Sequence, residues 1–369
     1  MNQIKIKNLK DIESYCLSQD WFTVLNEIDQ DLIWHSEGNV FIHTNMVVQS
    51  LWNDEDFLNL HSIELQEDLT WAAFLHDIGK ASCSELIAGR IRSHGHSMKS
   101  YRMASKILVG IENLNVDRRN RILNLIRFHG KPHYFLSDRI NPNPEILIAV
   151  QSARCCIRDL YLLAKADING RISDEPLSLE TLELYKGVAE ELKCWDKRYE
   201  FANPSQYYLA HRGSLGTFLY VPHESFNSHV LMLSGLPGAG KNWFIENRYC
   251  GDGIIITLDD IRKELGVKPT DNQGRVIQQT KKIFKIALAA GENIVLNATN
   301  LTSNIRQNWL GIARDYNALT CINYIEPKLS LIKEQNKNRD NPVPERVWSK
   351  MLDRLEIPQP FEANLVVFN

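Results

Sequence analysis

One short glycine-rich stretch constrains the fold of this chain more than any other feature. It reads Gly235-Leu236-Pro237-Gly238-Ala239-Gly240-Lys241 and follows residues 230–233, an apolar run typical of a strand buried on both faces. The residues after Lys241 are predicted to begin a helix, so the stretch has the setting of a phosphate-binding loop. Backbone N–H groups and the helix N-terminus attract an anion there. The sequence therefore predicts that this half of the chain binds a nucleotide, with Lys241 reaching the terminal phosphates.

Asn242 departs from the usual pattern of such a loop, in which Ser or Thr offers a hydroxyl to Mg²⁺. An amide oxygen also coordinates a hard cation, so we expect an altered metal contact rather than a lost site. ATP or another nucleoside triphosphate, together with Mg²⁺, is the expected ligand of the loop.

The pattern along the chain predicts two domains. Residues 1–202 read as helices without strand alternation, residues 203–227 as an aromatic inter-domain connection, and residues 228–369 as alternating strands and helices. The strands are predicted near 229–234, 253–258, 293–298, 319–325 and 364–368. We therefore expect an all-α domain followed by an α/β domain with a parallel sheet, whose ligands bind at the carboxyl ends of the strands.

Histidines and carboxylates fall at inward positions of the helices predicted over 68–80, 118–129 and 143–167. A further helix is predicted from 178 to about 199, and Gly79 is expected to end the first one. Polar side chains in such apolar helices cost several kcal/mol unless they are paired or bind a metal. The candidate metal ligands are His43, His76, Asp77, His94, His96, His129 and Asp167. Mixed nitrogen and oxygen ligands suit Mn, Fe, Co, Ni or Zn, although any single inward histidine is more often a satisfied core residue.

Lys80 and three other histidines lie near this set in the sequence and are not predicted to bind the metal. Lys80 either adds positive charge for a phosphate or is an exposed cation at a helix end. His35, His61 and His133 are expected to be ordinary surface or packing residues.

Three charged residues of the second domain are candidates for phosphoryl transfer. Asp259 follows the second predicted strand, where a carboxylate can accept a proton from an attacking hydroxyl, and Arg262 shares its helix face and can hold a phosphate. Arg339 lies in a polar, proline-interrupted segment, residues 336–344, that is typical of a mobile lid. The alternatives are a helix cap for Asp259 and a surface position for Arg262. Arg306 is expected either to contact phosphate or to lie at the surface.

Composition places the chain among ordinary globular proteins, with 44% hydrophobic and 24% charged residues and a net charge of −3. Seven cysteines without a Cys-x-x-Cys pair predict reduced thiols and a cytoplasmic location. The sequence holds no secretory signal and no apolar run long enough to cross a membrane, so no membrane partner is expected.

The histidine set resembles the HD superfamily of metal-dependent phosphohydrolases over about residues 30 to 170. The matching pieces are His43, His76-Asp77-Ile78-Gly79-Lys80, Ser93-His94-Gly95-His96, Phe128-His129-Gly130 and Ala166-Asp167. The resemblance implies a first metal held by His43, His76, Asp77 and Asp167. It implies a second metal held by His96 and His129 with Asp77 bridging, and His94 as a less certain member.

The second domain is similar to 5′-hydroxyl polynucleotide kinases of end-healing systems. The shared pieces are the Gly235-to-Lys241 loop, Asp259…Arg262, Thr299-Asn300, and Arg339 ahead of Val343-Pro344. The similarity implies that Asp259 is the general base, Arg262 binds the 3′ phosphate of the acceptor and Arg339 stabilises the transition state. Gln335 stands where a second lid arginine is often found.

An HD domain joined to such a kinase resembles the bacterial HD-Pnk family. That resemblance implies a bifunctional transferase and hydrolase of RNA or DNA repair. The kinase would phosphorylate 5′-OH ends, and the HD domain would remove 2′,3′-cyclic, 2′ or 3′ phosphates, ahead of a ligase. Two alternatives stay open: a nucleoside or small-molecule kinase fused to a nucleotide phosphohydrolase, and an ATP-sensing regulatory protein. The unusual Asn242 is the feature that supports the second alternative.

Overall fold

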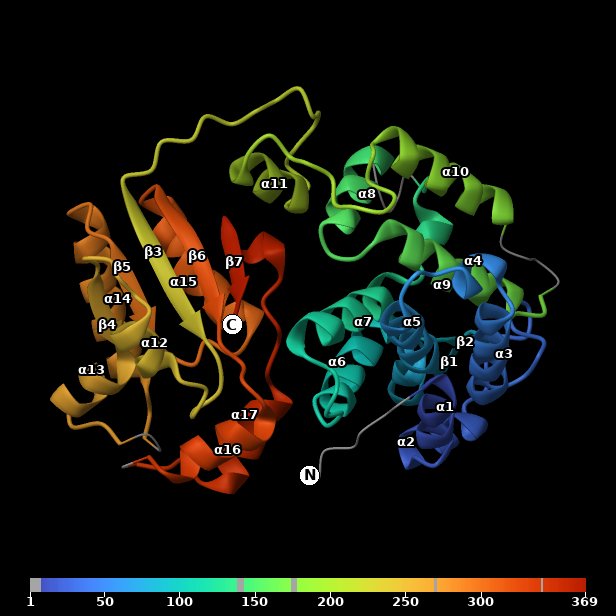
Figure 1. Ribbon diagram of the computed structural model, residues 1–369, viewed down its shortest axis with the longest axis horizontal. Helices are drawn as coiled ribbons and strands as arrows, with labels where there is room; N and C mark the ends of the chain where they lie inside the picture. The colour runs from blue at the N-terminus through green and yellow to red at the C-terminus, as the bar shows by residue number, and fades with distance from the viewer. Residues whose placement is uncertain (1–7, 138–142, 174–177, 269–270, 340) are drawn as a thin grey trace. The chain divides into compact units, whose positions relative to one another are not determined.

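The computed structural model describes residues 8–137, 143–173, 178–268, 271–339 and 341–369. The chain divides into two compact units, Met1–Glu200 and Phe201–Asn369, drawn blue to green and green to red in Figure 1. The first unit is helical apart from one short hairpin, and the second holds a five-stranded sheet with helices between its strands. The predicted fold class is confirmed.

The helices of the first unit are short, and several begin at an asparagine cap, as Asn39 shows by accepting a hydrogen bond from the Ile42 N–H. The α-helices are α1 (Leu9–Leu17), α2 (Asp20–Thr23), α3 (Val40–Trp52), α4 (Glu55–Leu58), α5 (Ile63–Leu75), α6 (His96–Leu108), α7 (Val116–Phe128), α8 (Pro144–Ser152), α9 (Ile157–Asn169) and α10 (Leu179–Glu191). The 3₁₀ turns are η1 (Val24–Glu27), η2 (Ile78–Ser82) and η3 (Pro132–Tyr134).

Helix α5 forms the centre of this unit, because every residue of its second half is buried. It contacts α1, α3, α7 and α9. The helix ends at Leu75, and the chain turns through His76 and Asp77 into η2, so the predicted helix over 68–80 is correct only in its first part. This early end places both polar residues beyond the apolar helix, where they face neighbouring elements.

Two further predictions for this unit were wrong in detail. The helix predicted over 143–167 is two helices, α8 and α9, because the backbone at Cys156 is extended and the Arg158 N–H donates to the Trp195 carbonyl at 3.1 Å. The helix from 178 ends at Glu191, short of 199.

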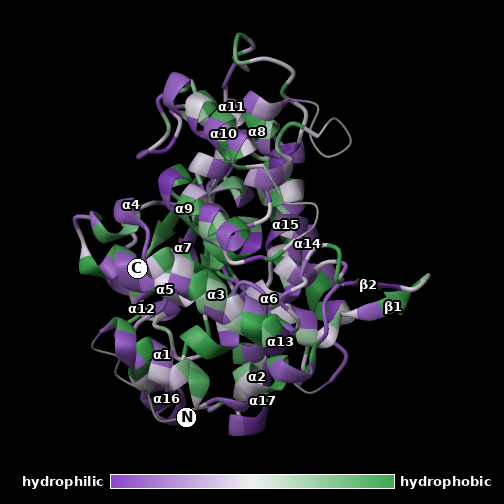
Figure 2. Ribbon diagram, turned by 90° about the vertical axis from the view of Figure 1, so that its right-hand side faces the viewer, coloured by the Kyte–Doolittle hydropathy of each residue, from purple (hydrophilic) through white to green (hydrophobic). Residues whose placement is uncertain are grey.

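Strands also occur where none was predicted. Residues Glu85–Ile87 (β1) and Arg90–Arg92 (β2) form an antiparallel hairpin that extends away from the helices of its unit (Figure 2). Its turn is Ala88-Gly89, with positive φ at both residues, and the segment is too short to show alternation in the sequence.

The second unit contains a parallel sheet in the order β4-β5-β3-β6-β7. Its strands are β3 (Ser228–Ser234), β4 (Ile254–Thr257), β5 (Ile294–Asn297), β6 (Ala318–Tyr324) and β7 (Leu365–Phe368). Each predicted strand agrees with the structure to within one residue at either end. The central strand β3 leads into the glycine loop, so the loop lies at the carboxyl edge of the sheet, where ligands of this fold class bind.

Helices connect and cover these strands. They are α11 (Pro204–His211), α12 (Lys241–Asn247), α13 (Leu258–Glu264), α14 (Gly274–Ala289), α15 (Ser303–Asp315), α16 (Leu329–Lys337) and α17 (Glu345–Asp353), with the 3₁₀ turn η4 (Pro360–Glu362). The core joins sheet and helices, for example through the edge-to-face contact of Phe284 with Trp309. Helix α11 lies within the segment expected to connect the domains, and it contacts η4 through His211 stacked on Phe361. No helix among the described residues is both long and apolar enough to cross a membrane.

Candidate functional site

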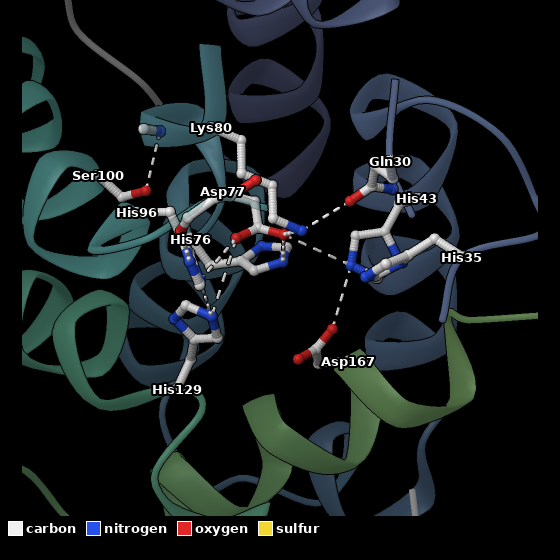
Figure 3. Close-up of polar contacts among 12 residues, drawn as sticks. Gln30, His35, His43, His76, Asp77, Lys80, His96, Ser100, His129 and Asp167 are labelled. Carbon is white, nitrogen blue, oxygen red and sulfur yellow. Dashed lines mark hydrogen bonds and ion pairs between the residues drawn. The ribbon is translucent and has the colours of Figure 1, made fainter. Parts of the chain in front are cut away.

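Six of the seven predicted metal ligands come together inside the helical unit. Figure 3 shows Asp77 between His76, His96 and His129 on one side and His43 with Asp167 on the other. They come from separate elements: α3 carries His43, the turn after α5 carries His76 and Asp77, and α9 carries Asp167. His96 is the first residue of α6, and His129 is the C-cap residue that follows α7.

The ligand atoms form two groups that share Asp77. His43, His76 and Asp77 place three ligand atoms within 4.8 Å of one another, and so do Asp77, His96 and His129. Asp167 Oδ1 adds a carboxylate oxygen 3.1 Å from His43 Nε2. The arrangement supplies nitrogen and oxygen donors for two neighbouring cations, with Asp77 between them.

The histidine rings are held in one tautomer by the backbone. His76 Nδ1 lies 2.8 Å from the Ala73 carbonyl, His96 Nδ1 3.0 Å from that of Ser93 and His129 Nδ1 2.7 Å from that of Ile126. A carbonyl only accepts, so each Nδ1 carries the proton. Each Nε2 is therefore left with a lone pair directed into the cluster, as metal-binding histidines require.

Buried polar atoms in the cluster lack hydrogen-bond partners among the described residues. They are His43 Nε2, His76 Nε2 and Asp77 Oδ1. His43 Nε2 and Asp167 Oδ1 are two acceptors at 3.1 Å with no donor between them, which is costly in a buried site. A shared cation would satisfy both, so the residues present fit a divalent metal.

Lys80 is buried, and the interpretation of it as an exposed helix-end cation was wrong. Its Nζ lies 2.7 Å from Asp77 Oδ2 and donates to Gln30 Oε1 at 2.6 Å (Figure 3). Burial alone would raise the pKa of Asp77, but the Lys80 ammonium holds that pKa well below its ordinary value. Lys80 thus keeps positive charge inside the cluster next to the shared carboxylate.

His94 is the one predicted ligand outside the cluster. It is exposed in the turn before α6, and neither group of ligand atoms that shares Asp77 includes it. His96, two residues later, is the member of the pair that faces Asp77, with Nε2 3.4 Å from Oδ1.

Gly79 serves close packing rather than ending a helix as predicted. Its N–H donates to Ser100 Oγ at 2.9 Å, and a Cβ placed there would lie 2.4 Å from the Ser100 nitrogen and 2.5 Å from the His96 carbonyl oxygen. Only a residue without a side chain lets η2 approach α6 so closely. This contact joins the two segments that carry Asp77 and His96.

The sequence analysis missed Glu37 and Arg171 next to the cluster, and it gave His35 and His133 only an ordinary surface or packing role. Arg171 makes a two-pronged ion pair with Asp167, at 3.1 Å from Nε to Oδ1 and 2.5 Å from Nη2 to Oδ2. His133, expected to be ordinary, is buried with Nε2 3.4 Å from Asp167 Oδ2. Burial alone would raise the pKa of Asp167, but the Arg171 guanidinium holds it well below the ordinary value. Arg171 follows Asp167 by one helical turn, which is the signal that could have revealed it.

The glycine loop of the second unit has the backbone shape of a phosphate cradle. Gly238 has φ +89°, and a Cβ there would lie 2.4 Å from the Ile332 carbonyl oxygen, so the loop needs glycine at this position. Trp348 Nε1 donates to the Pro237 carbonyl at 3.1 Å and ties α17 to the loop.

The side chains of Lys241 and Asn242 both form hydrogen bonds within the second unit. Lys241 Nζ donates to the carbonyls of Gly235 and Leu236, each at 2.9 Å. Burial and the positive charge of Arg339 lower the pKa of Lys241 to about 7. Asn242 Oδ1 accepts from Asn297 Nδ2 at 2.9 Å, so the residue that replaces the usual hydroxyl is paired with the end of β5.

The three charged candidates of this unit lie together; Asp259 and Arg339 are exposed, and Arg262 is half-buried. Arg262 Nη1 pairs with Asp259 Oδ1 across one turn of α13, and Arg262 Nε donates to Gln273 Oε1 at 2.9 Å. Arg339, beyond the end of α16, places Nη2 3.9 Å from Asp259 Oδ2. A carboxylate thus stands between two arginines.

Arg306 matches neither of its predicted roles. It is fully buried and bonds both oxygens of Glu362, at 2.7 and 2.9 Å, as well as the carbonyls of Asn300 and Glu356. This arginine belongs to the scaffold and is remote from solvent.

Comparison with protein families identifies both units. Residues 41–151 match the model of a family described as HD domain. Residues 230–358 match the model of a family described as AAA domain, and their sheet and glycine loop are those of a P-loop kinase. The chain joins an HD domain to a P-loop kinase-like domain. The two domains indicate an enzyme with transferase and hydrolase activity, which takes a nucleotide with Mg²⁺ and a divalent metal.

Similarity to individual proteins is distant. The chain is 23% identical over 137 residues to L-seryl-tRNA(Sec) kinase of Methanococcus maripaludis, a match of 35% of this chain and 53% of that protein. The chain therefore spans about half the length of this curated relative. Among solved structures, Chaetomium thermophilum Kti12 in complex with ADP-AlF3 matches with a TM-score of 0.30 and 15% identity, over 38% of this chain and 88% of the other. A gluconokinase from Sinorhizobium meliloti 1021 matches with a TM-score of 0.29 and 17% identity, over 39% and 83%.

Proposed function

We propose that this protein heals broken ends of RNA or DNA by two reactions. The kinase domain phosphorylates 5′-OH ends with ATP, and the HD domain removes 2′,3′-cyclic, 2′ or 3′ phosphates. The products are the 5′-phosphate and 3′-OH ends that a nucleic-acid ligase joins. The observation that carries the proposal is the grouping of Asp259, Arg262 and Arg339 at the end of β4, which offers a base and two phosphate-binding cations to an acceptor that bears its own phosphate.

In the proposed kinase reaction, Asp259 accepts the proton of the 5′-hydroxyl as its oxygen attacks the γ-phosphorus of ATP. The new bond joins that oxygen to phosphorus, the bond to the β–γ bridging oxygen breaks, and ADP leaves. Lys241 neutralises the terminal phosphates, and Arg339 neutralises charge on the transferring group. Arg262 holds the 3′ phosphate of the acceptor by a two-pronged contact.

In the proposed phosphoesterase, His43, His76, Asp77 and Asp167 would hold one metal ion, and Asp77, His96 and His129 would hold a second. Mn, Ni, Co, Fe or Zn suits these donors, and such an ion supplies an activated water and positive charge toward a phosphate. Lys80 compensates the charge of Asp77 and adds positive potential for the substrate, at 2.7 Å from the carboxylate.

The test uses a short RNA with a 5′-OH and a 2′,3′-cyclic phosphate, incubated with labelled ATP, Mg²⁺ and then Ni²⁺ or Mn²⁺. We expect label at the 5′ end and a metal-dependent loss of the terminal phosphate. The proposal would be overturned if both ends of the RNA stayed unchanged while nucleosides or nucleotides were consumed instead.

A second candidate is a kinase that acts on a hydroxyl of a small molecule or of an aminoacyl-tRNA. The match to an L-seryl-tRNA(Sec) kinase favours it. ATP consumption with seryl-tRNA, with a nucleoside and with a 5′-OH oligonucleotide separates the candidates, because only the true acceptor stimulates it. Stimulation by none of them, with tight ATP binding, would favour the ATP-sensing alternative.

A further inference from the structure

Glu37 lies buried between two histidine rings on the outer side of the metal cluster. Its carboxylate oxygen Oε1 is 2.8 Å from His35 Nδ1 and 3.0 Å from His43 Nδ1, and the side chain is 1% exposed. The other oxygen, Oε2, accepts the Ile172 N–H at 2.9 Å. One buried carboxylate therefore has three donors around it.

The contact with His43 is on the side of the ring away from the ligand groups. His43 Nε2 faces Asp167 and Asp77, at 3.1 and 3.8 Å, while Nδ1 faces Glu37 and, at 3.2 Å, the Gly170 carbonyl. His35, Glu37 and His43 also place three ligand atoms close together. Because His43 Nδ1 meets two acceptors there, it carries a proton, and this third grouping is an outer support rather than a third metal position.

Glu37 is held in place by a backbone clamp. The Ser36 N–H donates to the Ile172 carbonyl at 2.7 Å, and Ser36 Oγ reaches the same oxygen at 2.8 Å. Ser173 Oγ donates to the Ile33 carbonyl at 2.8 Å. The clamp joins the segment before α3 to the segment after α9, so it fixes Glu37 relative to both His43 and Asp167.

This support differs from that of the other rings in the cluster. His76, His96 and His129 rest on neutral backbone carbonyls, whereas His43 also has a carboxylate behind it. A carboxylate behind a metal-binding imidazole orients the ring and increases its basicity. The position that contains His43 is also buried throughout, while His96 of the other position has a side chain 28% exposed.

We propose that Glu37 is a positioning residue of the metal centre. It orients His43, so that the site formed by His43, His76, Asp77 and Asp167 binds its ion more tightly than the site that contains His96 and His129. This inference rests on the metal centre of the proposed function. It assigns unequal affinities to the two positions and gives the cause of the inequality.

The test is titration of the metal-free full-length protein with Co²⁺, followed by calorimetry and by the visible absorption of bound cobalt. We expect two binding events of unequal affinity. Glu37→Gln keeps the shape of the side chain but loses its charge, so it should weaken the tighter event by about 10–100-fold and change its absorption, while the weaker event stays unchanged. The matched control is Glu112→Gln, an exposed glutamate, which should change neither event.

His96→Ala isolates the tighter position, because it removes a ligand of the other one. In that background Glu37→Gln should still weaken the remaining event by the same factor. Unchanged binding in Glu37→Gln would overturn the inference, and so would equal weakening of both events together with a lower melting temperature of the metal-free protein. Absence of any Co²⁺ binding by the unsubstituted protein would instead refute the metal centre itself.

Discussion

The two candidate sites of this chain differ in how their charges meet solvent. His43, Asp77 and Asp167 of the HD domain are fully or almost fully buried and already in contact, whereas Asp259 and Arg339 of the kinase domain are exposed. The kinase domain also contains a buried ion pair, Arg306 with Glu362, which includes none of the three candidates for phosphoryl transfer. Contacts behind the ligands orient those of a metal centre, whereas a phosphoryl-transfer site can complete its contacts when the substrate binds. In the HD domain the buried residues His43, Asp77 and Asp167 are therefore candidate metal ligands, whereas in the kinase domain the buried ion pair stabilises the fold.

The largest expected effect comes from separating the two activities by substitution. Asp259→Ala should lower 5′ phosphorylation by about 10²–10⁴-fold, the range for loss of a general base, and leave phosphoesterase activity unchanged. Asp77→Ala should do the reverse, because it removes the carboxylate shared by both ligand groups. End-labelling and phosphate release measure the two reactions, and Asp260→Ala, an exposed neighbour, is the control. Loss of both activities in one variant would point to a single shared site or a folding defect.

Removing the buried arginine of the kinase domain should cost stability rather than catalysis. Arg306→Ala leaves Glu362 buried without its cation, which is expected to lower the free energy of unfolding by about 3–5 kcal/mol. Urea unfolding measures the loss, with the exposed Arg346→Ala as a matched control that stays within about 0.5 kcal/mol. A normal unfolding curve with a raised KM for ATP would show that Arg306 binds phosphate after all.

Crowding the contact between η2 and α6 should disturb the metal cluster. Gly79→Ala adds a methyl group 2.4 Å from the Ser100 nitrogen and should destabilise the HD domain by about 1–3 kcal/mol, and also weaken Co²⁺ binding because His96 shifts. Gly130→Ala is the control, since a Cβ there meets nothing within 4 Å. If Gly79→Ala and Gly130→Ala had the same melting temperature and the same metal affinity, the role given to Gly79 would be contradicted.

The smallest expected effect is a pH dependence of nucleotide binding. Lys241 has a pKa of about 7 without nucleotide, and bound phosphates should raise that pKa, so binding takes up a proton above pH 7. ATP affinity should fall by up to about tenfold per pH unit as the pH rises from 7. Calorimetry in buffers of different ionisation enthalpy measures the proton uptake, which Lys241→Arg should abolish. Equal uptake in that variant would assign the proton to another group.

Local patterns in the sequence predicted much of this molecule. Hydrophobic runs located all five strands of the parallel sheet, and inward helix positions located His76, Asp77, His129 and Asp167, because both depend on periodicity within one segment. Lys80 and Arg306 were misplaced because their burial depends on partners 50 and 56 residues away, Gln30 and Glu362. Glu37 was missed for the same reason, since Ile172, which holds it, is 135 residues distant. Contacts of this length leave no trace in a local pattern.

The β1–β2 hairpin occupies the stretch between Asp77 and His96, two residues that must keep their separation. That separation is fixed at the base, where Gly79 meets Ser100 and where the hydroxyls of Ser84 and Ser93 lie 2.8 Å apart. Farther out, Arg90 pairs with Asp31 at 2.7 and 2.9 Å, but Leu86 is 75% exposed and a Cβ at Gly89 of the turn would meet nothing within 4 Å. The tip is therefore a natural place to graft a fluorophore or a short tag, through which occupancy of the neighbouring centre could be followed in the working enzyme.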